Sequence, residues 1–177
     1  MSGKGFVSLL VAGAIAACGG CAPDVMPSPA SCAVAAQYLA GMDPATNGKK
    51  LAYTEEAESS VMPLSGSDWF PSGQPEAGTP PAALIEKFNR TKLVSAVKYC
   101  PAVRAMLDKA GSPHGKAVES QPGGELLGVA APVMSDDGAG ALLVLSDRSP
   151  IGLNDRTIQY MRRNKSGQWV VAALHRF

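Results

Sequence analysis

Residues 139–146 read A-G-A-L-L-V-L-S and include no charged side chain. Successive side chains of a strand point to opposite faces of the sheet, so this run is apolar on both faces. We therefore expect it to be the most covered strand of a sheet, around which the rest of the domain is arranged.

Three more strand-like runs share the last third of the chain. Two of the connectors between the runs contain Asp-Gly or Ser-Gly pairs and one is a longer loop over Asp147–Asp155, a pattern typical of hairpins. Pro132 has no backbone N–H, which predicts an edge position or a bulge. We expect a four-stranded antiparallel meander made of 139–146 and of Leu126–Met134, Arg156–Arg163 and Gln168–Arg176.

Two or three short N-terminal helices are expected to pack on this meander. Apolar side chains three and four positions apart predict helices over Ser31–Ala40, capped by Ser31, over Pro80–Lys92 after a capping Thr79, and from Cys100 to a stop at Gly111. Lys92–Tyr99 either continues the second helix or is extended. The predicted fold is a single two-layer α+β domain over 32–177, with a mobile Pro/Gly-rich insertion at 59–81.

The closing hairpins carry the pattern S-x-D-G-x-x-A-L-L-x-L at 135–145 and G-x-W-V-V at 167–171. This pattern resembles the ends of several small secreted bacterial proteins of uncharacterised role. It is also similar to the curved sheet of the nuclear-transport-factor-like cone folds, which implies that Trp169 packs inside. A hairpin with a buried tryptophan explains the turn equally well. The resemblance implies no activity, because such a fold hosts many unrelated functions.

The N-terminus has the layout of an export signal. Lys4 precedes an apolar run, F-V-S-L-L-V-A-G-A-I-A-A-C over Phe6–Cys18, and no charge falls between Phe6 and Pro23. About twelve apolar residues reach only ~18 Å as a helix, against a hydrocarbon core of ~30 Å. We therefore expect a signal peptide over 1–17 and not a membrane-spanning helix.

Ile15-Ala16-Ala17-Cys18 resembles the lipobox of bacterial lipoproteins. The resemblance implies cleavage after Ala17 and a diacylglycerol on Cys18, which then anchors the chain to the membrane through fatty chains such as palmitate. The alternative is an ordinary signal cut elsewhere, for example after Ala22. Gly19 stands where the family often carries an aspartate that keeps the protein at the inner membrane, which favours the outer membrane. Residues 18–31 are expected to form a flexible tether.

Three cysteines remain if Cys18 carries lipid. An exported chain meets an oxidising compartment, so pairing of two of them is expected. We predict a disulfide between Cys32 and Cys100, each at the start of a predicted helix, and leave the other pairings of Cys21 open.

Charge and motifs exclude several classes of function. The chain has 16 basic and 15 acidic side chains, and removal of Lys4 balances them, so no basic excess indicates nucleic acid. We find no motif for a cofactor or a metal and expect neither. Ser95-Ala-Val-Lys98 matches the S-x-x-K motif of penicillin-binding proteins by chance, since its partner motifs are missing. The basic cluster of Arg162, Arg163 and Lys165 is expected to be a solvated hairpin tip.

The functional hypotheses follow from these observations. His114 and His175 are the only histidines, and each is better explained as a structural polar residue than as a general base. Trp69 and Phe70 are expected to attach the 59–81 insertion to the core, with docking of a partner as the alternative. We expect a membrane-anchored envelope module that binds a protein or a small ligand without catalysis. The alternatives are a small envelope enzyme with an unrecognised site and an inhibitor or chaperone of an envelope enzyme.

Overall fold

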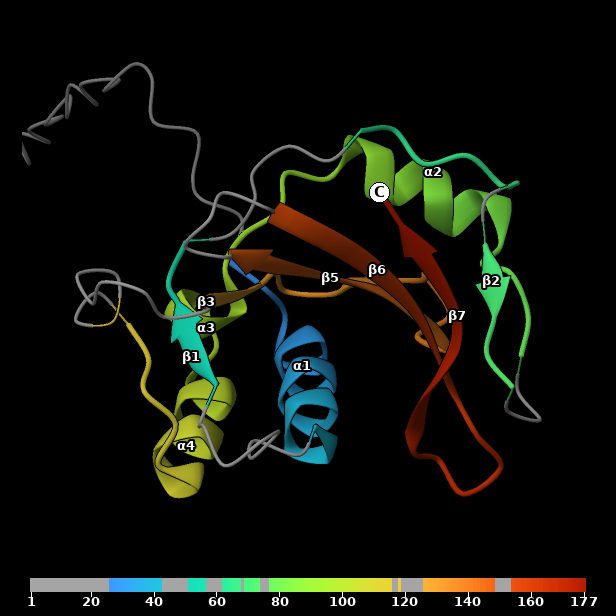
Figure 1. Cartoon of the computed structure of the whole chain (residues 1–177). Helices are drawn as coiled ribbons and strands as arrows, with labels where there is room; N and C mark the ends of the chain where they lie inside the picture. The colour runs from blue at the N-terminus through green and yellow to red at the C-terminus, as the bar shows by residue number, and fades with distance from the viewer. Residues whose placement is uncertain are drawn as a thin grey trace, which may run out of the picture.

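A computed structural model of the chain describes residues 26–42, 51–56, 62–67, 69–73, 77–115, 118, 126–148 and 154–177. In this part of the chain four helices pack on one curved, seven-stranded sheet with the order β1-β3-β5-β6-β7-β2, and β4 also pairs with β5 (Figure 1). The helices are α1 (Pro29–Gly41), α2 (Ala82–Arg90), α3 (Ala96–Tyr99) and α4 (Pro101–Ala110). The strands are β1 (Ala52–Thr54), β2 (Phe70–Pro71), β3 (Leu126–Val129), β4 (Val133–Met134), β5 (Gly140–Arg148), β6 (Asn154–Arg163) and β7 (Trp169–Arg176).

The predicted four-stranded antiparallel meander is wrong. The sheet is mixed, because β1 pairs in parallel with β3, while every other pairing is antiparallel. Two short strands, β1 and β2, come from segments that sequence patterns leave irregular. A strand of two or three residues is too short to show an alternation of apolar and polar side chains. Such strands are therefore recognised only from the strands with which they pair.

Pro132 divides the first predicted strand into β3 and β4, which both lie along the same edge of β5. Between them the chain leaves the ladder: the Ala131 N–H donates to the carbonyl of Val94 (2.8 Å), and the Pro132 carbonyl accepts from the Ser31 hydroxyl of α1 (2.6 Å). The interruption that proline imposes thus becomes an attachment point for α1.

Strand β5 is the most covered strand, as its sequence predicts. It pairs with β6 along its whole length, from Gly140 opposite Arg162 to Arg148 opposite Asn154. Leu142 and Leu143 point to opposite faces, and neither has any exposed surface. Both faces of the sheet therefore need a covering layer.

Helices cover both faces, so the domain has three layers and not the two that we expected. On one face, which we call the α1 face, α1, α3 and α4 pack against Leu143 and Met161. On the other, α2 and the segment around Leu64 and Trp69 pack against Leu142 and Ile158. Figure 1 shows α2 on the opposite side of the sheet from α1 and α4.

The helix ends follow local capping chemistry with two shifts from expectation. The hydroxyl of Ser28 caps α1 by accepting from the Ser31 N–H (3.1 Å), so the helix begins at Pro29, within the last residues of the expected tether. α2 begins after Pro81 without a side-chain cap. Gly111, at φ 64°, ends α4 in the left-handed conformation that favours glycine.

Both outer strands are short, and each has a feature that limits further pairing. The free edge of β1 is occupied by the chain at 113–115: the Tyr53 N–H donates to the Pro113 carbonyl (2.9 Å), and the Gly115 N–H donates to the Tyr53 carbonyl (3.0 Å). At the opposite end, half of β2 is Pro71, which has no N–H to donate.

The predicted disulfide is present between Cys32 of α1 and Cys100, the residue before α4. Their Cα atoms lie 5.2 Å apart, and both side chains are buried. Because 68 positions separate the two cysteines, the bond joins parts of the α1-face layer that are distant in sequence.

We expect Cys32→Ala/Cys100→Ala to lower the free energy of unfolding by about 2–4 kcal/mol, because the chain-entropy contribution for this loop is ~4 kcal/mol. Urea unfolding followed by circular dichroism measures the difference. The native protein in excess thiol is the matched control and should approach the double variant. An unchanged midpoint would show that the bond adds nothing to stability.

Candidate functional site

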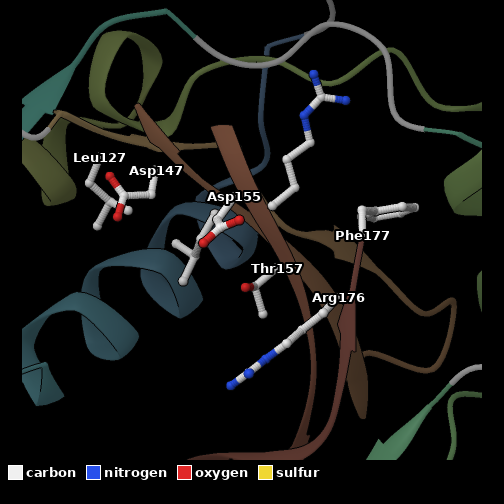
Figure 2. Close-up of a pocket in the computed structure, with 8 residues that line it drawn as sticks. Leu127, Asp147, Asp155, Thr157, Arg176 and Phe177 are labelled. Atoms are coloured by element: carbon white, nitrogen blue, oxygen red, sulfur yellow. The ribbon is translucent and has the colours of Figure 1, made fainter. Parts of the chain in front are cut away.

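A depression of about 530 Å³ lies at one end of the α1 face, beyond the helices. We call it the end pocket. Figure 2 shows Thr157 and Arg176 directed to one side of the β6–β7 pair and Phe177 to the other. The side chains that β3, β5, β6 and β7 direct to the α1 face are Leu127, Leu145, Asp147, Asp155, Thr157 and Arg176, and Arg156 and Phe177 complete the lining.

The strand register places the six α1-face side chains in two rows. Leu127, Asp147 and Asp155 lie opposite one another across β3, β5 and β6. The second row contains Leu145, Thr157 and Arg176 across β5, β6 and β7. Cβ atoms of directly opposed residues lie about 4.5–5.5 Å apart, so each row brings its side chains together at the surface.

The end pocket combines the two carboxylates of Asp147 and Asp155 with two guanidinium groups, those of Arg156 and Arg176. Asp147 and Asp155 are exposed and directly opposed on one face of the sheet, so their like charges repel each other. Arg176 lies diagonally from Asp155, one row away. In the described part of the chain, the side chains of Asp155, Thr157 and Arg176 make no hydrogen bond or ion pair. These polar groups are therefore available to a ligand.

A polar stripe extends from the end pocket along β6 and under α1. Gln159 follows Asp155 and Thr157 on the same face, is buried, and donates from Nε2 to the hydroxyl of Tyr38 on α1. Its Oε1 is buried with no partner among the described residues. Burial raises the pKa of the Tyr38 hydroxyl above its ordinary value.

A second depression, of about 400 Å³, lies where the end of α1 meets the β6–β7 hairpin. Trp169 is half-buried here and packs against the α1-face core. The guanidinium of Arg163 lies 5.0 Å from the centre of the Trp169 ring. Arg163 thus contacts the hairpin's own tryptophan, and Arg162, Arg163 and Lys165 are all exposed.

Trp69 and Phe70, the two candidate docking residues, occupy different environments. Trp69 is 7% exposed, donates from its indole N–H to the Ser65 carbonyl (3.1 Å), and meets His175 edge-on at 5.4 Å. Phe70, on β2, is 63% exposed. Trp69 attaches the segment to the sheet, which leaves Phe70 alone as a surface side chain.

Neither histidine lines the end pocket. His175 is buried between Trp69 and Phe177 on the α2 face, and His114 lies beside β1, where its Nδ1 is 3.0 Å from the Ser112 carbonyl oxygen. Ser95 of the S-x-x-K match caps α3 by accepting from the Lys98 N–H (3.2 Å). This contact accounts for the spacing of Ser95 and Lys98 without catalysis.

The residues expected to carry the lipid and the remaining thiol, Cys18 and Cys21, lie outside the described residues. Within the described ranges no helix is long and apolar enough to span a bilayer. A search of the same ranges finds no cluster of three or more potential metal ligands among His, Cys, Asp and Glu.

Sequence reasoning missed Asp147, Asp155 and Arg176. The first two were assigned to a connector, whereas β5 extends to Arg148 and β6 begins at Asn154. A signal was present: if the hairpin register of the two apolar strands is continued outward towards the loop, Asp147 falls opposite Asp155.

Comparisons with known proteins found no relative of this chain. No protein-family model matches the chain, and no curated protein and no solved structure is significantly similar to it. Function must therefore be argued from the residues themselves.

We expect Trp69→Ala to lower the free energy of unfolding by about 3–5 kcal/mol, because the buried ring fills the α2-face core. Phe70→Ala is the matched control, since its exposed ring should change stability by less than about 0.5 kcal/mol. Thermal and urea unfolding of both variants give the comparison. Equal effects would contradict the separation of the two roles.

Asp155→Asn should stabilise the protein by about 0.2–1 kcal/mol at low ionic strength, because it removes the repulsion from Asp147. The gain should shrink as salt screens the pair. Asp136→Asn is the control of opposite sign, since it removes the exposed ion pair with Lys87 (2.5 Å). A loss of stability in Asp155→Asn would show that the pair is not repulsive.

Proposed function

We propose that the chain is a lipid-anchored protein of the bacterial cell envelope that binds a small ligand in the end pocket without chemically changing it. The lipobox-like Ile15–Cys18 supports the anchor, and the end pocket supports binding. The observation that carries the binding role is the set of unpartnered polar side chains, Asp155, Thr157 and Arg176, on one rigid sheet.

A rigid sheet suits recognition better than a loop does. The polar groups of the end pocket stand on β5, β6 and β7, whose backbones are fixed by long antiparallel ladders. A ligand therefore meets groups that are already positioned, and less conformational entropy is lost on binding. None of the side chains lining the pocket in the described structure is a histidine or a cysteine, the residues that most often act as general bases and nucleophiles.

The expected anchor leaves room between the domain and the membrane. From Cys18 to Pro29, where α1 begins, an extended chain spans up to ~40 Å. The domain would thus stand clear of the lipid headgroups, with its pocket accessible from the aqueous compartment.

The anchor is tested with Cys18→Ser, expressed in a bacterium that processes lipoproteins. We expect the native chain in the membrane fraction, with a diacylglycerol on Cys18 by mass spectrometry, and the variant released into the soluble fraction, because the serine lacks the sulfur that carries the lipid. Cys21→Ser is the matched control and should remain in the membrane fraction. An unmodified Cys18, or equal fractionation of Cys18→Ser and the native chain, would refute the anchor.

The binding role is tested by complementation of a deletion strain with Asp155→Asn/Arg176→Gln. We expect loss of complementation at unchanged protein level, because the charges of Asp155 and Arg176, on which the proposed binding depends, are gone. Full complementation would refute the pocket as the functional site.

A further inference from the structure

We propose that the depression between the end of α1 and the β6–β7 hairpin binds an uncharged sugar ring that stacks on Trp169. We call it the hairpin pocket. Its volume of about 400 Å³ lies within the usual range for small-molecule sites, ~300–1,000 Å³. The lining includes Gln37, Tyr38, Gly41, Gln168, Trp169 and Val171. This inference goes beyond the proposed binding in the end pocket and does not rest on it.

Trp169 supplies the stacking surface. Its ring is half-buried, and the Cζ atom of Arg163 lies 5.0 Å from the ring centre. Arg163 does not line the hairpin pocket, so the ring meets the pocket with another part of its surface. Because the guanidinium and the core already hold the ring, little conformational entropy is lost on binding. The negative face of an aromatic ring attracts the weakly positive C–H hydrogens on the apolar face of a sugar.

Uncharged polar groups accompany the ring. Gln37 and Gln168 are exposed, and within the described ranges neither side chain makes a hydrogen bond. A side-chain amide has both a donor and an acceptor, as each hydroxyl of a sugar does. The Tyr38 hydroxyl accepts from Gln159 and keeps its own proton to donate. The lining therefore pairs an apolar platform with groups that suit hydroxyls.

The lining favours a neutral ligand over a charged one. None of the described residues that line the hairpin pocket has a charged side chain. The basic side chains of the neighbouring hairpin, Arg162, Arg163 and Lys165, lie outside the lining. A charged group that leaves water without a partner is strongly disfavoured. An acidic sugar would therefore bind more weakly than its neutral counterpart.

Gly41 keeps space open in the hairpin pocket. It is the last residue of α1, its φ is not positive, and a Cβ at this position would meet no described atom within 4 Å. Neither the backbone nor the packing thus requires glycine, which weakens a helix relative to alanine. Gln37 lies one turn earlier on the same side of α1. The missing side chain leaves room for a ligand between α1 and the hairpin (Figure 1).

The test is isothermal titration of the purified full-length protein, in a detergent without a sugar headgroup, with cellobiose and with cellobiouronic acid. We expect cellobiose to bind and cellobiouronic acid to bind at least about tenfold more weakly, because its carboxylate finds no partner in the lining. No heat with cellobiose up to about 10 mM, or equal affinity for the two sugars, would overturn the proposal. Tighter binding of cyclohexanol would also overturn it, since that ring lacks the set of hydroxyls.

Fluorescence locates the bound sugar. Trp69 and Trp169 are the only tryptophans of the chain, so Trp69→Phe leaves Trp169 as the single reporter. We expect a saturable change in its emission with the same midpoint as the heat of binding. Binding heat without a change in emission would place the sugar elsewhere and overturn the proposal.

Gly41→Leu fills the hairpin pocket without disturbing the fold. We expect a melting temperature no lower than that of the native protein, because leucine is a better helix former, and at least about tenfold weaker binding of cellobiose. Gly73→Leu is the matched control: Gly73 has equally open surroundings but lies outside the lining, so this variant should bind as the native protein does. Unchanged affinity in Gly41→Leu would overturn the proposal.

Discussion

The structure depends on strand β5, whose apolar side chains on both faces force the chain to build a layer on each side of the sheet. Full burial of one leucine contributes about 1.5–3 kcal/mol, so Leu142 and Leu143 together contribute a share comparable with the whole net stability of a domain, about 5–15 kcal/mol. Every other strand except β1, β2 and β7 pairs directly with β5, and β7 is one strand away.

The layer on the α1 face ends before the sheet does, and this difference in extent creates the candidate site. α1 is held in place by the disulfide to Cys100, by the bond from Ser31 to the Pro132 carbonyl, and by the pair of Tyr38 and Gln159. Beyond Gln159 the same face of β6 continues as Thr157 and Asp155, which none of the four described helices covers. The side chains that β6 directs to this face are buried in the core further along the strand, and they form a polar surface at its end.

Much of the helical and disulfide framework was predictable, because it follows from local rules. Apolar periodicity located α1, α2 and α4, and a proline and a glycine marked the two ends of α4. The expectation of export predicted the pairing of Cys32 with Cys100. The sheet was predictable only in its long strands. β1 forms where Leu126–Gly128 offers a parallel partner, and β2 forms where β7 offers a free edge.

The candidate site was harder to predict, because its residues are ordinary until the register brings them together. Asp147 and Asp155 are characteristic of a loop in sequence, and eight positions separate them. Arg176 lies beyond both, on another strand. Only the continuation of the β5–β6 ladder past its apolar part makes the two carboxylates neighbours. Which charged side chains lie together at the end of a hairpin depends on how the strands pair, and the amino-acid composition does not show it.

The two short outer strands of the sheet have a consequence for the association of copies of the chain. One rim is occupied by the backbone at 113–115, and at the other Pro71 removes a donor from a strand of two residues. Among the described residues, neither rim offers the long row of vacant donors and acceptors through which sheets add to one another. Copies at high concentration can therefore remain separate molecules and escape fibril growth.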